Sequence, residues 1–210
     1  MTERTSPTRV DFWFDPLCPW TWLTAEWLIE VATLRPLDIR WRIMSLAVLN
    51  DGREFPEEYI DLMRRAWRPV RVITAAEQQH GPAVVGPLFT EIATRYHHDG
   101  RSDDDAILAE SLAAVGLPPH LLEAADTDAW DTALRASHTE AMDLVGDDVG
   151  SPVIRLPDIS SDVAYFGPVV NPVPRGDDAL RLWSGIQTLV STPQLYELKR
   201  TRTTPPTFDS

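Results

Sequence analysis

The chain has 210 residues, of which 43% are hydrophobic and 24% are charged, and its formal net charge is −13. This is enough apolar material for a substantial core, in one large domain or in one domain that carries a large insertion. A surface this negative repels polyanions, so nucleic acid and anionic membranes are not expected as partners, and no apolar run is long enough to cross a membrane.

The first 46 residues predict a β-α-β unit. Apolar side chains at every second position of residues 10–14 indicate a strand with one buried face. Pro19 suits the first position of a helix because its missing N–H costs nothing there, and helical spacing continues to about Leu34, just before Pro36. Residues 39–43 alternate between apolar and arginine side chains and predict a second strand. A parallel pair with a right-handed crossover is the expected arrangement.

The middle of the chain, residues 56–145, shows helical patterns only. One helix begins near Pro56 and is expected to kink or break at Pro69. Further helices are expected over residues 82–98, with a weak point at Gly86, and over residues 128–145. Consecutive helices without an intervening strand predict an inserted helical subdomain.

Strand patterns return after Pro152. Residues 153–156 and 163–166 flank a turn-rich segment, which is a hairpin signal, and a last amphipathic helix includes residues 182–190. The order β-α-β, helices, β-β-α is that of an α/β thioredoxin fold with a large helical insertion. The expected division is residues 1–50 and 147–192 for the two halves of the thioredoxin fold, 51–146 for the insertion and 193–210 for a C-terminal tail.

Cys18, the only cysteine, falls between the first predicted strand and the first predicted helix. Unpaired N–H groups and the positive end of the helix dipole stabilise a thiolate at such a place, and they lower cysteine pKa values from about 8.5 to roughly 3.5–7.5. The alternative is a buried, inert cysteine that happens to precede a proline. A single cysteine excludes an internal disulfide, and residues 1–9 are too polar for a secretory signal, so a cytoplasmic location is expected.

The segment Gly150-Ser151-Pro152 precedes the third predicted strand. In a thioredoxin-type site, a cis proline at this point of the chain faces the reactive cysteine and exposes backbone with which a substrate can pair as an added strand. The alternative is an ordinary trans proline, since only about 5–6% of X-Pro bonds are cis. The chain order favours the cis form.

Several segments resemble one family of proteins along nearly the whole chain. They are FWFDPLCPW at 12–20, MSLAVLN at 44–50, AWRPVRV at 66–72, AEQQHG at 76–81, VGDDVGSP at 145–152 and LKRTRT at 198–203. The first segment resembles the active-site helix start of DsbA-like oxidoreductases. Together the segments resemble the actinobacterial mycothiol-dependent nitroreductases within that group.

The resemblance implies a cytoplasmic, homodimeric enzyme that takes electrons from mycothiol, a low-molecular-weight thiol. Its substrates would be disulfides or small electrophiles such as nitro-aromatic compounds. The residues implied at a substrate-binding site are Pro19, Trp20, Asn50, Tyr59, Ser151 and Pro152. Core packing is the alternative role for Trp20, and capping or packing for Asn50 and Tyr59.

The chain departs from the family motif Cys-Pro-Trp-Cys at its last position, which is Thr21. An enzyme with one cysteine cannot resolve its own mixed disulfide, so a second external thiol must do so. The Thr21 hydroxyl lies on the same side of the first helical turn as Cys18 and could donate a hydrogen bond to the thiolate, worth about 1.5–3 kcal/mol. Plain helix packing is the alternative role of Thr21.

Two other classes of function stay open on this sequence. One is a thiol-cofactor-dependent isomerase or transferase, in which a single residue activates the sulfur of the cofactor without net redox change. The other is a non-catalytic protein that binds a thiol.

No metal is expected at the remaining titratable residues. His97, His98 and the acidic residues 103–105 fit no recognised ligand spacing and indicate a solvated acidic loop. His138 is expected to be structural. Arg200 and Arg202 are candidates for binding a carboxylate or simply form a basic tail.

Overall fold

The computed structural model describes residues 6–54 and 56–208. The strands are β1 (Thr8–Phe14), β2 (Leu37–Ile43), β3 (Val153–Arg155) and β4 (Ala164–Phe166). The α-helices are α1 (Pro19–Leu34), α2 (Leu46–Leu49), α3 (Glu57–His80), α4 (Val85–Ala93), α5 (Asp104–Ala114), α6 (Asp131–Val145) and α7 (Gly176–Val190). Short 3₁₀ segments cover Pro82–Val84 (η1) and Pro119–Asp126 (η3), and a π-helical turn covers Thr94–His98 (η2).

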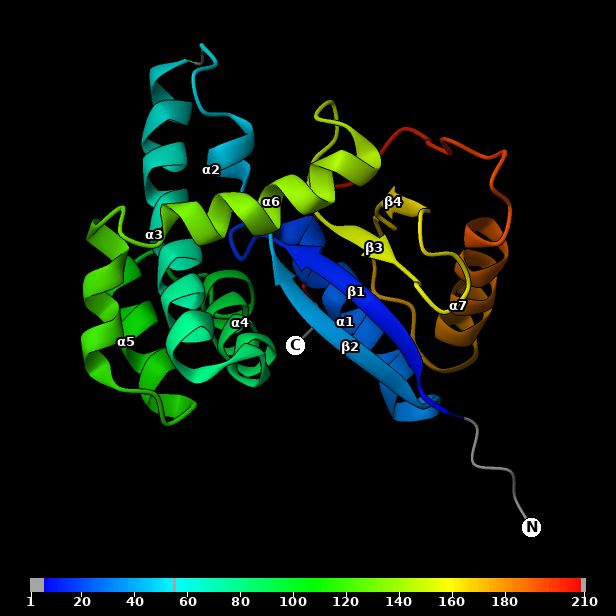
Figure 1. The fold of residues 1–210 in the computed structure, drawn as a ribbon, viewed down its shortest axis with the longest axis horizontal. Coiled ribbons are helices and arrows are strands. Elements are labelled where there is room, and N and C mark those ends of the chain that lie inside the picture. Colours follow the sequence, from blue (N-terminus) through cyan, green and yellow to red (C-terminus); the bar gives the residue numbers. More distant parts are fainter. Residues whose placement is uncertain (1–5, 55, 209–210) are drawn as a thin grey trace.

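The sheet has the order β2-β1-β3-β4. β1 and β2 are parallel, with Phe12 opposite Trp41, and β3 is antiparallel to both β1 and β4. This confirms the predicted β-α-β unit and the predicted hairpin, and it is a thioredoxin fold with the helices α2–α6 inserted between β2 and β3 (Figure 1).

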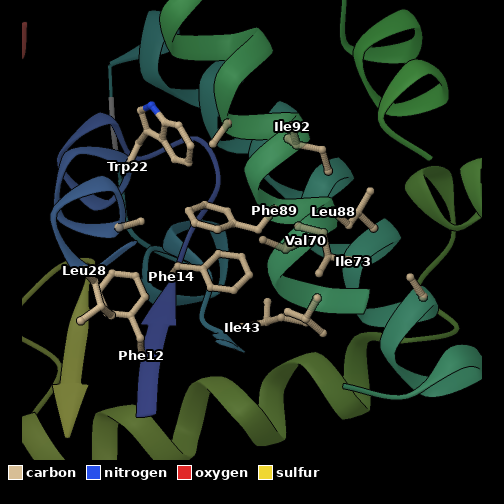
Figure 2. Close-up of a cluster of buried hydrophobic side chains, with 14 of the residues drawn as sticks. Phe12, Phe14, Trp22, Leu28, Ile43, Val70, Ile73, Leu88, Phe89 and Ile92 are labelled. Carbon is tan, nitrogen blue, oxygen red and sulfur yellow. The ribbon is translucent and has the colours of Figure 1, made fainter. Parts of the chain in front are cut away.

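The alternation in β1 separates two buried layers. Phe12 and Phe14 face α1 and the inserted helices, where the ring of Phe14 stacks on Phe89 of α4 with centroids 4.0 Å apart (Figure 2). Trp13 points to the opposite face, where it packs with Met44 and with Ala141 of α6. The insertion therefore shares the core of the sheet.

Helices α1 and α7 pack against each other beside the sheet. The indole N–H of Trp27 in α1 donates to the carbonyl of Ala179 in α7 at 3.1 Å, and both residues are fully buried. This contact holds the N-terminal end of α1, where Cys18 lies, in a fixed relation to the second half of the fold.

The inserted helices add detail to the expectation at three places. α3 runs through Pro69 without a break. α6 begins at Asp131, three residues later than expected, because residues before it form a turn in which Thr127 Oγ1 accepts from the backbone N–H of Ala129. Gly86 lies inside the first turn of α4 and is a point of close packing.

Replacing Gly86 by alanine should destabilise the protein. A Cβ at this position would lie 2.5 Å from Nε1 of the Trp41 side chain, and that indole is packed against Phe12, Phe14 and Phe89. We expect Gly86→Ala to lower the free energy of unfolding by roughly 1–3 kcal/mol, measured by urea denaturation. Gly185→Ala is the matched control, since no atom lies within 4 Å of a Cβ there. That variant should gain about 0.5–1 kcal/mol from helix propensity; equal behaviour of the two variants would contradict this packing.

No helix in the described part of the chain has both the length and the apolar composition that crossing a bilayer requires.

Candidate active site

Cys18 is the N-cap residue of α1. A turn in which its N–H donates to the carbonyl of Asp15 at 3.1 Å connects it to the end of β1. Pro19 occupies the first helical position, as expected. The Cys18 side chain makes no capping hydrogen bond, so its sulfur lies beside the open N–H groups of the first helical turn.

The sulfur is enclosed by two residues of other segments. Cys18 Sγ donates to the carbonyl oxygen of Ser151 at 3.5 Å, and the Ser151–Pro152 peptide bond is cis, as the chain order indicated. Cys18 is 6% exposed, Ser151 4% and Thr21 0%. The three side chains thus form one buried cluster.

The direction of the hydrogen bond between Ser151 and Thr21 depends on the charge of Cys18. Ser151 Oγ accepts from the backbone N–H of Asp15 at 3.0 Å and lies 2.5 Å from Thr21 Oγ1. When the Thr21 hydroxyl donates to a Cys18 thiolate, Thr21 Oγ1 is free to accept, and Ser151 supplies the proton of the bond between the two hydroxyls. Ser151 therefore orients Thr21 toward the sulfur.

The expectation of a lowered cysteine pKa is wrong for this resting geometry. Burial raises the pKa of the Cys18 thiol above its usual value, and the negative charge of Asp15 adds to the rise. Hydrogen bonds from the Thr21 hydroxyl and from the backbone N–H groups of Thr21 and Trp20 act in the opposite direction. The helix terminus does stabilise the thiolate, but the removal of water from the sulfur outweighs it.

Asp15 is a buried carboxylate that sequence reasoning did not single out. Its two oxygens accept from the backbone N–H groups of Leu17 (2.9 Å) and Leu46 (2.7 Å). Burial raises its pKa to about 6, while these two bonds lower it. Asp15 thereby ties the loop after β2 to the turn that carries Cys18. The available signal was an aspartate directly after a buried strand and before a proline.

Trp20 is partly exposed beside the cysteine, and the guanidinium of Arg202 lies over its ring, 4.9 Å from the centroid. Of the two tail arginines considered as candidates, Arg202 is thus placed at the rim of this cluster.

Asn50 and Tyr59 lie at the entry to the inserted helices. The Asn50 amide donates to the carbonyl of Leu46, at 2.8 Å, and contacts Met63 of α3. Tyr59 is 45% exposed on the first part of α3. Their roles at the site stay predictions.

The acidic residues 103–105 are engaged with arginines. Asp103 pairs with Arg101, Asp104 with Arg65, and Asp105 with Arg68. Among the residues that the structure describes, no group of three or more His, Cys, Asp or Glu side chains has a geometry that could hold a metal ion.

His138 on α6 is buried, 6% exposed, and its Nδ1 accepts from the backbone N–H of Ser45 at 3.3 Å. Burial lowers its pKa to about 4, and the charge of Arg135 adds to this. His138 is therefore neutral at pH 7 and supports the loop that also bonds to Asp15.

This histidine makes the protein sensitive to acid. Between its unfolded pKa of about 6.5 and its folded pKa of about 4, only the unfolded state binds the proton, so stability is fully present above pH 6.5 and is lost as the pH falls. The raised pKa of Asp15 acts in the opposite direction. We expect His138→Gln to reduce the loss of unfolding free energy between pH 7 and pH 4.5 by about 2–3 kcal/mol, measured by urea denaturation at both pH values. The same loss in variant and parent would contradict a neutral buried His138.

Residues 17–200 match the model of a protein family described as "Rv2466c-like: Mycothiol-dependent nitroreductase Rv2466c". The chain is 31% identical over 197 residues to the uncharacterized protein Rv2286c of Mycobacterium tuberculosis, covering 92% of this chain and 82% of that protein.

Solved structures with a similar fold include two enzymes. The cytosolic disulfide reductase DsbM from Pseudomonas aeruginosa matches with a TM-score of 0.54 and 20% identity, over 86% of this chain and 99% of that one. A 2-hydroxychromene-2-carboxylate isomerase matches with a TM-score of 0.59 and 19% identity, over 86% and 95% of the two chains. At these identities the likeness supports the fold alone.

Proposed function

We propose, since this chain belongs to the Rv2466c-like family of mycothiol-dependent nitroreductases, that it is a cytoplasmic thiol-dependent oxidoreductase with Cys18 as its single nucleophile. The observation that carries the proposal is the position of the sulfur. It lies at the N-terminus of α1, within reach of the Thr21 hydroxyl and against the carbonyl of Ser151.

The proposed reaction with a disulfide has two exchanges. The Cys18 thiolate attacks one sulfur of the substrate, forms a mixed disulfide and releases the other sulfur as a thiolate that takes a proton from water. A mycothiol thiolate then attacks the mixed disulfide at the substrate sulfur and restores the Cys18 thiolate. The products are the thiol released in the first exchange and the disulfide of mycothiol with the half of the substrate that was bound to Cys18, so no second protein cysteine is needed.

Small electrophiles such as nitro-aromatic compounds are the second proposed substrate class. Two mycothiol molecules supply the two electrons and two protons that convert a nitro group to a nitroso group and water, and they leave as mycothiol disulfide. Trp20, Asn50 and Tyr59 are proposed to line the space for such a substrate, and Pro19, Ser151 and Pro152 to complete the wall around the sulfur. We also propose that the enzyme is a homodimer.

Two features support Thr21 as part of this mechanism. It is fully buried with its hydroxyl 2.5 Å from that of Ser151, and the Thr21 hydroxyl lowers the pKa of Cys18. Because burial raises the pKa of Cys18, the thiolate depends on these few donors for its stability. Thr21 is thus proposed as the residue that makes a monothiol site workable in place of a second cysteine.

Steady-state kinetics test the proposal. We expect reduction of a small disulfide to require mycothiol and to give parallel lines in double-reciprocal plots, because a covalent Cys18 adduct separates the two half-reactions. Intersecting lines together with unchanged activity after alkylation of Cys18 would contradict a covalent intermediate.

One observation favours a second candidate, a thiol-cofactor-dependent isomerase or transferase. A Cys18 thiol with a raised pKa is a hydrogen-bond donor at neutral pH, and such a donor can stabilise the thiolate of a bound cofactor without reacting itself. In that case turnover causes no net oxidation of thiol, which a thiol titration before and after the reaction detects.

A further inference from the structure

The last described residues of the chain, 202–208, form an extended segment that we call the C-terminal strap. The chain leaves α7 at Val190, and the Tyr165 hydroxyl donates to the carbonyl of Leu195 at 2.7 Å. In Figure 1 the orange-to-red C-terminal segment continues from the end of α7. The strap lies beyond residues 17–200, the part that matches the family.

The stretch 204–207 of the strap is bound to the segment after β4. Asn171 makes four hydrogen bonds to it: its Nδ2 donates to Thr204 Oγ1 (3.0 Å) and to the carbonyl of Pro205 (2.8 Å), and its Oδ1 accepts from the backbone N–H (3.0 Å) and the hydroxyl (2.7 Å) of Thr207. These four bonds use both donors and both acceptor sites of one amide side chain. A single residue therefore fixes the path of the strap.

Phe208, the last described residue of the strap, contacts the inserted helices. Phe208 stacks on His97 with ring centroids 5.4 Å apart and meets His98 edge-on at 5.8 Å. His97 Nε2 donates to the carbonyl of Pro16 at 2.9 Å, two residues before Cys18. Burial lowers the pKa of His97 to about 4, so this ring is neutral when it stacks with Phe208 at pH 7.

Arg202 contacts the residue beside the proposed nucleophile. Its guanidinium lies 4.9 Å from the centre of the Trp20 ring. The strap thus touches the segment after β4, the N-terminal turn of α1 and the π-helical turn of the insertion, and the last two adjoin the turn that carries Cys18.

A protein substrate contacts a wider area around Cys18 than a small disulfide does. Exchange with a folded protein disulfide brings several hundred Å² of its surface against the enzyme, around a cysteine residue that is 6% exposed. A small disulfide contacts far less of this surface. Because Arg202 of the strap lies over Trp20, the strap hinders the approach of proteins to Cys18 more than the approach of small disulfides.

We propose that the C-terminal strap, through Arg202 on Trp20 and Asn171 as its anchor, makes Cys18 selective for small thiols and small disulfides over folded protein disulfides. The inference rests on the proposed function of Cys18 as the nucleophile.

The test compares two probes, oxidised mycothiol and insulin, with second-order rates measured by intact-mass detection of the mixed disulfide. The variants are the full chain, a chain ending at Arg200, and the full-length substitutions Asn171→Ala and Arg202→Gln, which serve if the shortened chain does not fold. Tyr196→Ala is the matched control, because Tyr196 is 90% exposed in the same tail but outside the strap.

We expect the shortened chain and Asn171→Ala to react with insulin at least tenfold faster than the parent, with rates for oxidised mycothiol within about twofold. Arg202→Gln should change the insulin rate in the same direction, and Tyr196→Ala should change neither rate. Unchanged insulin rates, or equal increases with both probes, would overturn the strap as a selector while leaving the proposed function intact. Failure of every variant, parent included, to react with either probe would overturn the proposed function itself.

Discussion

Replacing Cys18 by serine should abolish reduction of small disulfides, with a loss of roughly a thousandfold or more toward the uncatalysed rate. A serine oxygen cannot form or exchange a disulfide, and the part of the chain that the structure describes contains no other sulfur nucleophile. The measurement is the mycothiol-dependent rate of disulfide reduction by the purified variant. A hydroxyl fills nearly the same space and can still donate to the Ser151 carbonyl, so unfolding free energy should change by less than about 1 kcal/mol.

The same variant separates the candidate functions. In an isomerase or transferase, the serine hydroxyl can still donate to a cofactor thiolate, so turnover would persist within a few-fold of the parent. In a non-catalytic binding protein, thiol affinity would be unchanged and neither protein would turn over. Persistent turnover in Cys18→Ser would therefore contradict the oxidoreductase mechanism.

Replacing Thr21 by valine should raise the pKa of Cys18 further. Valine keeps the shape of threonine but removes the hydroxyl that donates to the thiolate, and a hydrogen bond to a charged group contributes about 1.5–3 kcal/mol. At pH 7 the rate of alkylation by iodoacetamide should fall about 10- to 100-fold, in step with the thiolate fraction. The pH dependence of thiolate absorbance near 240 nm and of the alkylation rate measures this pKa directly.

Thr21→Ser is the matched control, since it retains the hydroxyl and the bond to Ser151. Its Cys18 pKa should stay close to that of the parent. Ser151→Ala tests the orientation of the Thr21 hydroxyl, because it removes the hydroxyl that can donate to Thr21 Oγ1. This variant should raise the Cys18 pKa by less than Thr21→Val does. An unchanged pKa in Thr21→Val would assign Thr21 to helix packing alone.

The order of the elements could be predicted because the local signals were strong. Period-two alternation in residues 10–14, the proline at position 19 and the hairpin signal around residues 157–162 each depend on neighbours in the sequence. The helices could be placed, but α3 does not break at Pro69, and the close contact of Gly86 was not predicted. The packing of Gly86 against Trp41 joins residues 45 positions apart, and no local pattern reports such a contact.

The placement of the cis Ser151–Pro152 peptide against Cys18 was predictable from the sequence, and the energetics of the site was not. The chain order indicated that Ser151–Pro152 would face Cys18, and the structure has the Ser151 carbonyl against the sulfur. The pKa of Cys18 was predicted with the wrong sign because the sequence reports the helix terminus but not the depth of burial. Asp15 was missed because its burial and its bond to Leu46, a residue of a distant segment, are also absent from the local sequence pattern.

The contacts of the tail were beyond sequence reasoning. Asn171, Arg202 and Phe208 belong to polar or proline-rich stretches without periodicity, and their partners lie up to about 180 residues away along the chain. Such contacts depend on the finished arrangement of the two halves of the fold.

In the proposed mechanism, Cys18 forms a mixed disulfide that an external thiol resolves. Intact-mass spectrometry after incubation with oxidised mycothiol, and again after addition of reduced mycothiol, tests this most directly. We predict a single mycothiol adduct on Cys18 in the first step and its complete removal in the second. A Cys18 that stays unmodified from pH 6 to pH 9 would contradict its role as the nucleophile and favour a non-redox role for this thiol.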